Sequence, residues 1–354
     1  MAQFIPLLES ALRRIQPPVA WVLGAPRLIA QLARRLDLPG SVAFQMDLYQ
    51  AERLQEELAA AKIDAQVQTA PDLWDLPPVF ETVIFPSPPR AERELKIDMV
   101  EQAYHILRPG GHFVVLSPHR ADDLFPRLIK KVFGRASVSD SPEGTIIWAE
   151  RQGDRPRRRH EVTVHARVDD GEPLRFVTRP GVFTYGQLDA GSRALLLAAE
   201  IHPGDHVLDL GCGAGAVGLA AARKTGPAGQ ITFVDSNVRA TALTELNARQ
   251  AGLPHYQVYS VSRLQGLPKH QFDVILTNPP YYAVDSITQR FVERSRELLK
   301  PGGRFYLVTK QWATVDPIVR QFYEDPEIFE NRGYFILATR SPRASQTASV
   351  IPTN

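Results

Sequence analysis

HVLDLGCGAGAVGLAAA, residues 206–222, is the stretch that decides the fold of this chain. Its first five residues form a continuous β-type run, as expected of a central parallel strand buried on both faces. Gly211, Gly213 and Gly215 follow, and then a run of small apolar residues that favours a helix. Glycine lets the backbone turn sharply and approach a ligand where a Cβ atom would clash. Because ligands of open α/β sheets bind at the carboxyl ends of the strands, the pattern predicts a cofactor site at this turn.

Acidic residues near the turn distinguish between two kinds of cofactor. With Ala216 counted, the glycine pattern also fits a dinucleotide-binding fingerprint. Asp209, directly before the turn, would repel a pyrophosphate but can serve the ammonium group of a methionine moiety, directly or through water. The next predicted strand ends in Asp235, whose carboxylate can accept hydrogen bonds from both ribose hydroxyls, and Ser236 follows it. These residues predict a nucleoside cofactor, and Asp209 favours S-adenosylmethionine.

Two serines follow the third predicted strand, 255–259. A residue that contacts the adenine of the cofactor is expected at this place. The hydroxyl of Ser260 or Ser262 can reach the adenine edge, although a role in the turn itself is an equal alternative.

A second informative stretch is FDVILTNPPYY, residues 272–282. It predicts a strand that ends, at the same edge of the sheet, in Asn278, Pro279, Pro280 and Tyr281. An exocyclic amine is a poor nucleophile because its nitrogen lone pair is delocalised. Two acceptors, the Asn278 carboxamide oxygen and the Pro279 carbonyl, would draw the nitrogen towards tetrahedral geometry and stabilise its developing positive charge. The prolines would stiffen the turn and Tyr281 would stack on the substrate, although Asn and Pro also serve simply to end strands.

The N-terminal half repeats this order of elements. FETVIFPSPP (80–89) and HILRPGGHFVVLSPH (105–119) correspond to FDVILTNPPYY and ELLKPGGRFYLVTKQ (297–311). VAWVLGAPRLIAQLA (19–33) and SVAFQMDLYQAERLQEEL (41–58) correspond to 206–222 and QITFVDSNVRATALTEL (230–246), which pairs Asp47 with Asp235. The first copy keeps one glycine in its first turn and has Ser87, Pro88 and Pro89 in place of the tetrapeptide. We infer an internal duplication whose first copy has lost its site.

Composition sets the remaining limits. A chain of 354 residues with 44% hydrophobic and 23% charged residues suits two globular domains. Its one cysteine, Cys212, excludes an internal disulfide and a multi-cysteine zinc site, and no metal-binding cluster is visible. No apolar run approaches the ~20 residues of a membrane span and no signal-peptide pattern is present, so we expect a cytoplasmic protein. The net charge of +2 permits nucleic-acid binding without arguing for it, and the arginines of 155–159 favour a linker over an RNA contact.

From about residue 161 to 340 the chain resembles class I S-adenosylmethionine-dependent methyltransferases of the Asn-Pro-Pro-Tyr type. The duplication, together with FTYGQLDAGSRALLL (183–197), resembles the two-domain bacterial ribosomal RNA guanine-N2 methyltransferases. The resemblance implies that Asp209, Gly211, Gly213 and Asp235 bind S-adenosylmethionine and that the tetrapeptide 278–281 holds the target amine. It also implies an antiparallel last strand at 333–340 and a lid-like segment that brings Asp189 near the cofactor. For Asp189, a role as helix N-cap is an equal alternative.

The resemblance gives an α/β fold of two tandem Rossmann-like class I methyltransferase domains with mostly parallel seven-stranded sheets, the N-terminal one degenerate. We expect a degenerate domain for structure or RNA recognition over 1–154, a basic linker and β-hairpin over 155–182, a catalytic domain over 183–342 and a flexible tail over 343–354. The expected partner is ribosomal RNA or a ribosomal subunit, and a monomer is plausible.

Three classes of function compete with this interpretation: other methyltransferases that use the same tetrapeptide, dehydrogenases and silent scaffolds. Glutamine-N5 protein methyltransferases and adenine-N6 nucleic-acid methyltransferases use the same tetrapeptide, but the duplication argues against them. A dinucleotide-dependent dehydrogenase gives residues 278–281 no role and places Asp209 beside a pyrophosphate. A catalytically silent RNA-binding scaffold accounts for the first copy, but it does not explain why the second copy keeps every expected catalytic element.

Overall fold

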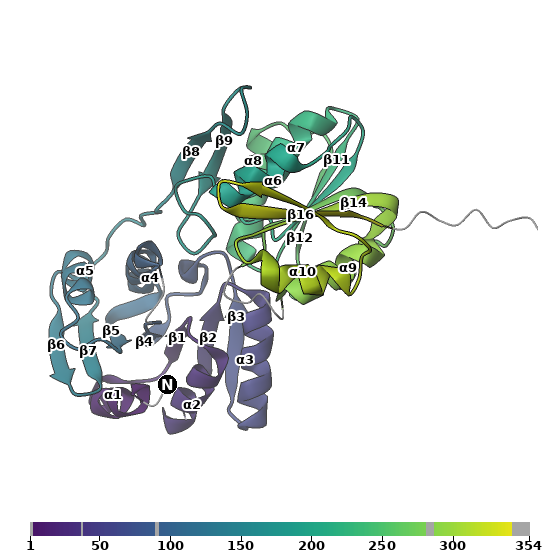
Figure 1. The fold of residues 1–354 in the computed structure, drawn as a ribbon. Coiled ribbons are helices and arrows are strands. Elements are labelled where there is room, and N and C mark those ends of the chain that lie inside the picture. Colours follow the sequence, from purple (N-terminus) through teal and green to yellow (C-terminus); the bar gives the residue numbers. More distant parts are fainter. Residues whose placement is uncertain (1–2, 37, 89–91, 281–286, 342–354) are drawn as a thin grey trace, which may run out of the picture. The chain divides into compact units, whose positions relative to one another are not determined.

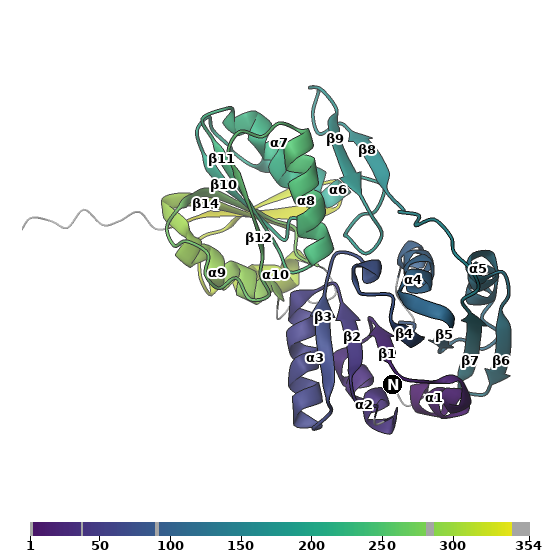
Figure 2. The same cartoon turned by 180° about the vertical axis from the view of Figure 1, so that it is seen from behind.

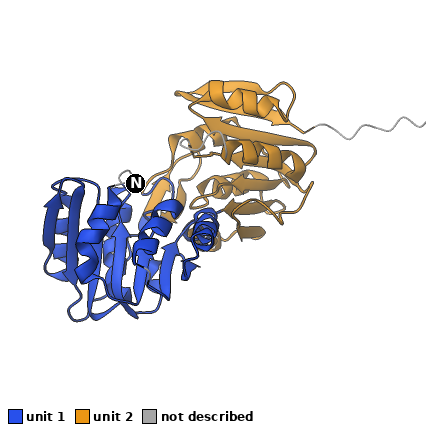
Figure 3. Cartoon of the chain, turned by 90° about the horizontal axis from the view of Figure 1, so that it is seen from below, with its two compact units in different colours: residues 1–162, 178–185, 236–242 blue, residues 163–177, 186–235, 243–354 orange. Residues whose placement is uncertain are grey.

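The computed structural model describes residues 3–36, 38–88, 92–280 and 287–341. The chain divides into two compact units, drawn in two colours in Figure 3. Unit 1 comprises residues 1–162, 178–185 and 236–242, and unit 2 comprises residues 163–177, 186–235 and 243–354. Each unit is built on its own seven-stranded sheet.

The sheet of unit 1 has the strand order β3-β2-β1-β4-β5-β7-β6. Its first five strands are parallel, β7 pairs antiparallel with β5, and β6 pairs antiparallel with β7. The strands are β1 (Val19–Val22), β2 (Ser41–Gln45), β3 (Ala65–Thr69), β4 (Phe80–Pro86), β5 (Leu107–Ser117), β6 (Ser137–Ser141) and β7 (Gly144–Glu150). The helices are α1 (Phe4–Ala11), α2 (Pro26–Leu36), α3 (Leu48–Ala60), α4 (Arg93–Ile106) and α5 (Leu124–Phe133), with short 3₁₀ turns η1 (Leu12–Arg14) and η2 (Leu73–Asp75).

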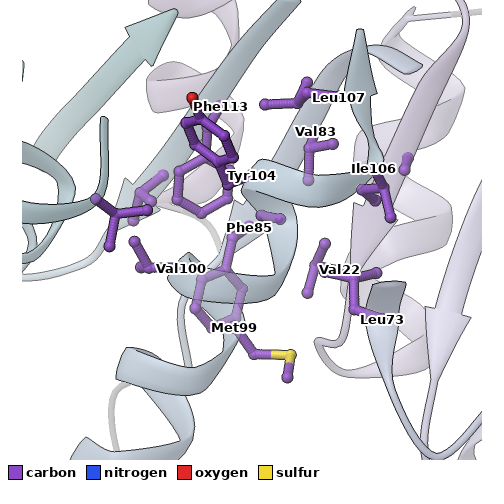
Figure 4. Packing of buried hydrophobic residues seen from close by; sticks show 14 of the residues in the cluster. Val22, Leu73, Val83, Phe85, Met99, Val100, Tyr104, Ile106, Leu107 and Phe113 are labelled. Atoms are coloured by element: carbon purple, nitrogen blue, oxygen red, sulfur yellow. The ribbon is translucent and has the colours of Figure 1, made fainter. Parts of the chain in front are cut away.

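Helices lie on both faces of this sheet (Figure 1), and a separate hydrophobic core fills each face. Successive residues of a strand point to opposite faces, so Val83 and Phe85 enter one core while Ile84 enters the other. Figure 4 shows the first core, in which Val83 and Phe85 pack with Met99 and Val100 of α4. Burial on both faces explains why the central strands read as unbroken apolar runs.

The sheet of unit 2 repeats that topology in the order β12-β11-β10-β13-β14-β16-β15. Its strands are β10 (His206–Leu210), β11 (Gln230–Asp235), β12 (Tyr256–Ser260), β13 (Phe272–Thr277), β14 (Leu299–Thr309), β15 (Glu327–Asn331) and β16 (Tyr334–Arg340). The helices are α6 (Ala190–Ala198), α7 (Ala216–Thr225), α8 (Val238–Gln250), α9 (Gln289–Leu298) and α10 (Trp312–Arg320). A separate two-stranded sheet joins β8 (Val162–Ala166) and β9 (Leu174–Thr178), at the place where the sequence predicted a hairpin.

Helices cover both faces of the second sheet as well, with α6, α7 and α8 on one side and α9 and α10 on the other (Figure 2). The strand predicted at 333–340 is β16, which pairs antiparallel with β14. The predicted fold class, two seven-stranded and mostly parallel sheets, is therefore confirmed.

Strand register shows which residues of the two sheets correspond. Asp235 pairs with Ser260 at the end of β11, and Gln45 pairs with Thr69 at the end of β2. Gln45 is therefore the counterpart of Asp235. The pairing of Asp47 with Asp235 expected from the sequence was wrong by two residues, because Asp47 stands at the start of the helix that follows the strand.

The same register identifies two further replacements in unit 1. Leu210, the last residue of β10, pairs with Val234, and Val22, the last residue of β1, pairs with Phe44. Leu210 and Val22 therefore correspond, and the residues before them, Asp209 and Trp21, correspond as well. Both β4 and β13 shift register after their first residue, at Phe80/Thr82 and Phe272/Val274. Counted from that shift, Pro86 is the counterpart of Asn278. The comparison of the two sequence motifs gave Ser87 this role and was wrong by one residue. Pro89, which also belongs to that motif, lies outside the described residues.

The first turn of unit 1 is closed by its own side chains. The amide of Gln45 donates to the carbonyl of Gly24 over 3.0 Å. A Cβ atom on Gly24 would lie 3.0 Å from Cδ1 of Ile29, so this side chain packs directly against the turn. Both features agree with the predicted loss of the site from the first copy.

A buried cluster of charges joins the separate segments of unit 1. Arg239 donates to Asp98 over 2.7 Å and to Asp72 over 3.1 Å, and Arg179 forms a bidentate pair with Asp72. Two guanidinium groups and two carboxylates balance one another, which is the condition under which buried charges are tolerated.

The basic linker is also held by unit 1. Arg155 pairs with Glu101 over 3.2 Å, Arg157 stacks over Trp74, and Arg159 lies 3.7 Å from Asp72. These contacts support the interpretation of the arginines as a structural linker.

Helix α7 packs unusually close to β11 in unit 2. A Cβ atom on Gly218 would lie 2.2 Å from the ring of Phe233, which is fully buried. Only a residue without a side chain allows this approach.

We predict that Gly218→Ala destabilises the protein by about 1–3 kcal/mol, because the added methyl group must displace α7 or the buried ring. The sign of this change in the free energy of unfolding is informative, because replacing glycine with alanine inside a helix ordinarily stabilises a protein by about 1 kcal/mol. Urea denaturation of both proteins measures the difference, and an increase in stability would show that α7 is not fixed against β11.

Candidate active site

The glycine turn after β10 is fixed to the neighbouring strand by backbone amides. Gly211 and Cys212 both donate to the carbonyl of Val234, over 2.8 and 3.0 Å. Gly213 donates to the carboxylate of Asp235 over 2.9 Å. Gly211 and Gly213 have φ values of 79° and 55°, in the left-handed region that glycine adopts without strain. The turn and Asp235, predicted separately as cofactor-binding residues, therefore form one hydrogen-bonded unit.

The far side of the turn rests on α8. Gly215 has φ of 84°, and a Cβ atom on it would meet Thr244 at 3.1 Å. The side-chain amide of Asn247, which is buried, donates to the carbonyls of Ala214 and Val177, and its oxygen accepts from the amide of Val177. The sequence analysis missed both Thr244 and Asn247, because a polar residue on a helix gives no sign of the turn that it supports.

Asp209 is deeply buried, with 2% of its surface exposed. Its carboxylate accepts from the amide of Gly218 over 2.8 Å, so it lies against the amino end of α7. The pKa of Asp209 is raised to about 7, mainly by burial and to a smaller extent by the charge of Asp235, against the opposing effect of the hydrogen bond from Gly218. Contact with a methionine ammonium group, expected from the sequence, stays a prediction.

Asp235 and the serines divide between the two units. Ser260 pairs with Asp235, the amide of Val261 donates to the Asp235 carbonyl over 3.0 Å, and Ser262 follows. Ser236 instead counts with unit 1, where its hydroxyl donates to Asp47 over 2.5 Å. The structure thus brings Ser260 to the side of Asp235, with Ser262 two residues further along the chain, and groups Ser236 with a different set of residues.

Asn278 is held by the amino end of α6. Its side-chain nitrogen donates to the carboxylate of Asp189 over 2.7 Å and to the hydroxyl of Ser192 over 3.0 Å. Asp189 also accepts from the amide of Ser192 over 2.9 Å, so it is the N-cap of α6, and that alternative is confirmed. An ionised carboxylate only accepts hydrogen bonds, so the NH2 group of Asn278 must face Asp189 and its oxygen must point elsewhere.

The rest of the tetrapeptide follows at the same edge of the sheet. Thr277, which is buried, donates from its hydroxyl to the carbonyl of Leu210 over 2.8 Å and so joins the end of β13 to the start of the glycine turn. Pro279 is buried and Pro280 is half-buried. Tyr281 lies outside the described residues.

Ser192 and Thr277 were not predicted as site residues. Ser192 could have been found, because a residue three positions after an N-cap is close to the capping side chain. The role of Thr277 depends on strand register, which the sequence does not show.

Cys212 has the properties of a packing residue. It is buried, and burial together with the charges of Asp235 and Asp209 raises the pKa of its thiol well above the ordinary value. A thiol in this state is a poor nucleophile. Among the residues that the structure describes, no group of three His, Cys, Asp or Glu side chains could hold a metal ion, and no helix is long and apolar enough to cross a membrane.

A seven-stranded sheet of this order, a glycine turn tied to an acidic residue on the next strand and an Asn-Pro-Pro turn at the same edge together define the class I methyltransferase fold. Residues 173–338 match the family described as Methyltransferase small domain. The resemblance predicted from the sequence is confirmed in this region.

Relatives cover more of the chain. A ribosomal RNA small subunit methyltransferase C of Pseudomonas aeruginosa is 31% identical over 226 residues, which make up 60% of this chain and 65% of that protein. Its namesake in Pseudomonas entomophila is 32% identical over 220 residues, 59% of this chain and 65% of the other. These matches span a little under two thirds of the length of the relatives.

A solved structure matches the chain over both units. It is a T. thermophilus 16S rRNA N2 methyltransferase in complex with AdoMet and guanosine, with a TM-score of 0.73, 21% identity, and coverage of 95% of this chain and 92% of the other. At this level of identity the likeness establishes the two-domain fold.

Asp209 gives a testable pH dependence of stability. Its pKa is about 7 in the folded protein against 3.8 for an ordinary aspartate. Because the folded pKa is raised, its contribution to stability is complete below pH 3.8 and is lost as the pH rises to about 7. The loss is up to about 1.4 kcal/mol per pH unit.

The matched control is Asp209→Asn, because an asparagine oxygen can still accept from Gly218 and does not titrate. We expect the free energy of unfolding of the wild type, relative to this variant, to fall from pH 5 to pH 7 and to stay constant above that. Denaturant titrations at each pH measure it, and parallel curves would mean that Asp209 titrates normally.

Proposed function

We propose that this protein transfers a methyl group from S-adenosylmethionine to the exocyclic N2 amine of a guanine in ribosomal RNA. The observation that carries the proposal is the orientation of Asn278. Its NH2 group is bound by Asp189 and Ser192, so its oxygen is directed to the other side, where an amine can donate to it. This arrangement lies at the same sheet edge as the glycine turn and Asp235.

The residues at that edge fit S-adenosylmethionine. The carboxylate of Asp235 suits two ribose hydroxyls, and Ser260 or Ser262 stands beside it for the adenine. Gly211, which is exposed, allows close approach of a ligand to the backbone. When bound, S-adenosylmethionine supplies a methyl group on a sulfonium centre, an electrophile that needs no metal.

The protein's own contribution is to prepare the nucleophile. The Asn278 oxygen and the Pro279 carbonyl accept the two protons of the target amine, which localises the nitrogen lone pair for attack. As the N–C bond forms, the methyl–sulfur bond breaks and the sulfur keeps its electron pair as a neutral thioether. Positive charge thus develops on the nitrogen, and the two fixed acceptors stabilise it more than they stabilise the neutral amine. The methylated amine then loses one proton to solvent. Tyr281 is proposed to stack on the guanine and keep it aligned.

Ribosomal RNA as substrate is supported by what the relatives are called and by the guanosine in the T. thermophilus complex. The first copy also supports an RNA substrate. It keeps the fold but has Trp21, Gln45 and Pro86 where the second copy has Asp209, Asp235 and Asn278, so it is free to serve structure or RNA recognition. We propose that residues 1–154 serve structure or RNA recognition, 155–182 link the domains, 183–342 carry catalysis and 343–354 form a tail. The partner is ribosomal RNA or a ribosomal subunit.

The first experiment is transfer of radiolabelled methyl groups from S-adenosylmethionine to ribosomal subunits and to naked ribosomal RNA, followed by nucleoside analysis. Label in N2-methylguanosine supports the proposal. Label in N6-methyladenosine, or in glutamine of a ribosomal protein, would keep the amine chemistry and refute the substrate. S-adenosylmethionine binding without any transfer would indicate a silent scaffold.

Two substitutions separate the roles of the site residues. Asn278→Ala is expected to lower turnover by about two to three decades with cofactor binding retained, the scale of losing one preorganised polar group. Asp235→Ala is expected to weaken cofactor binding instead. Calorimetric titration with S-adenosylmethionine and initial rates test both, and an equal loss of cofactor affinity in the two variants would refute this division.

Asp189 is predicted to act through Asn278. In Asp189→Asn the helix cap is kept, because asparagine caps as well as aspartate, but Asn278 loses a partner that can only accept. We expect turnover to fall about tenfold, since a hydrogen bond to a charged group is worth about 1 kcal/mol more than a neutral one. Cofactor affinity and melting temperature should change little. Unchanged turnover would mean that Asp189 serves only as the cap.

A further inference from the structure

Aromatic side chains gather at one corner of unit 2, where β14 ends and β16 begins. Trp312 is 42% exposed, and its ring lies 6.0 Å from that of Phe335. The ammonium group of Lys310 lies 4.7 Å from the ring centroid of Tyr334. We call these four residues, Lys310, Trp312, Tyr334 and Phe335, the aromatic platform.

Strand register places the platform at the edge of the sheet that holds the proposed site. Thr309, the last residue of β14, pairs with Phe335, and Lys310 and Trp312 follow it. On the other side of β14, Thr277 pairs with Leu307, so Asn278 leaves the sheet about level with these residues. Asn278 and the platform are therefore separated by the width of one strand.

One platform residue also touches the segment that orients Asn278. A Cβ atom on Gly191 would lie 2.7 Å from Cε1 of Tyr334, so the tyrosine ring packs against the amino end of α6. Gly191 stands between Asp189 and Ser192, the two residues that bind the Asn278 amide. Through Tyr334 the platform therefore borders the segment that orients Asn278. Phe335 is the next residue of β16 and points to the opposite face of the sheet, where it lies against Trp312 at the start of α10.

The charges on this corner are incompletely balanced. Within the described part of the chain, neither Lys310 nor Arg332, which lies in the turn before β16, has a carboxylate within ion-pair distance. Two acidic residues lie beside the platform: Asp189, near Tyr334 at the start of α6, and Glu330, which is exposed and pairs across the hairpin with Phe335. One exposed indole and two half-buried rings beside these cations suit a polyanion with planar groups.

We propose that the aromatic platform binds the nucleotides that flank the target guanine, with their bases stacked on Trp312 and Phe335 and a phosphate at Lys310. This inference rests on the proposed function for the identity of the target. Single-stranded RNA combines stackable bases with backbone charge, which matches the platform's chemistry. A protein partner fits less well, because the centre of a protein interface is depleted in lysine.

The test compares binding of a short single-stranded RNA, one guanosine among uridines, with binding of S-adenosylmethionine. Trp312→Ala should weaken RNA binding about tenfold, the scale of one lost base stack, and Trp312→Phe should keep most of the affinity. Leu197→Ala, which removes an exposed apolar side chain at the far end of α6, is the control and should change nothing. Affinity for S-adenosylmethionine should be the same in all four proteins.

Charge and fluorescence give two independent readouts. Lys310→Gln should lower the slope of log affinity against log salt by about 0.7, the release of one counterion from a single strand. Lys269→Gln, which removes a lysine paired with Glu297 before β13, should leave the slope unchanged, while Glu330→Gln should strengthen binding. Trp21 and Trp74 are buried, and Trp148 is half-buried in unit 1. RNA at the platform should therefore quench the fluorescence of the wild type more than that of Trp312→Phe.

The possible outcomes distinguish this inference from the proposed function. Loss of RNA binding in Trp312→Ala without guanine methylation by the wild type would support the platform and refute the function. If Trp312→Ala binds RNA as tightly as the wild type does, the proposal that the platform binds RNA is refuted. It is also refuted if this variant loses RNA binding and S-adenosylmethionine binding equally. Concentration-dependent dimers that disappear in Trp312→Ala, with RNA affinity unchanged, would make the patch a protein interface and also overturn it.

Discussion

The carbonyl of Val234 accepts two hydrogen bonds from the glycine turn, and the carboxylate of Asp235 accepts a third. These bonds tie the loop after β10 to the end of β11, and the rest of the site depends on them. Gly211 and Gly213 must adopt left-handed conformations to make them. The chain then enters α7, which must approach β11 closely enough that Gly218 cannot carry a side chain. The backbone geometry of the glycine turn thus restricts which residues can stand in the turn after β10, at the end of β11 and at the start of α7.

A second constraint begins at Asp189, which performs two tasks with one carboxylate. It caps α6 through the amide of Ser192 and also accepts from the side chain of Asn278. Helix formation and orientation of the proposed catalytic amide are therefore coupled, and α6 cannot form in this position without defining the direction of Asn278. From the sequence, a place near the cofactor and a role as helix N-cap were alternatives for Asp189. The structure confirms the cap and adds a contact with Asn278, because the capping side chain stands at the edge where β13 ends.

Most of the fold could be predicted because it follows from local patterns. Apolar runs such as 206–210 and 272–277, glycine turns and the repeated order of elements are all visible in the sequence, and both sheets have the predicted form. The residues that were missed or misaligned depend on register or tertiary packing. Asn247 supports the glycine turn from α8, a helix that begins only after the next strand. Strand pairing makes Gln45 the counterpart of Asp235, whereas residue spacing alone indicated Asp47, two positions further on.

Comparison of the two units shows how little of a class I methyltransferase fold belongs to its site. Unit 1 keeps the strand order, both apolar cores and the register shift at the start of β4. It has Trp21, Gln45 and Pro86 where unit 2 has Asp209, Asp235 and Asn278. Asp209 is a buried carboxylate whose pKa burial raises, which is a cost to folding above pH 3.8; Trp21 at its counterpart carries no such cost. A polar group that destabilises the folded state is kept only where it has a task, and its replacement by packing residues in one copy is what release from that task would produce.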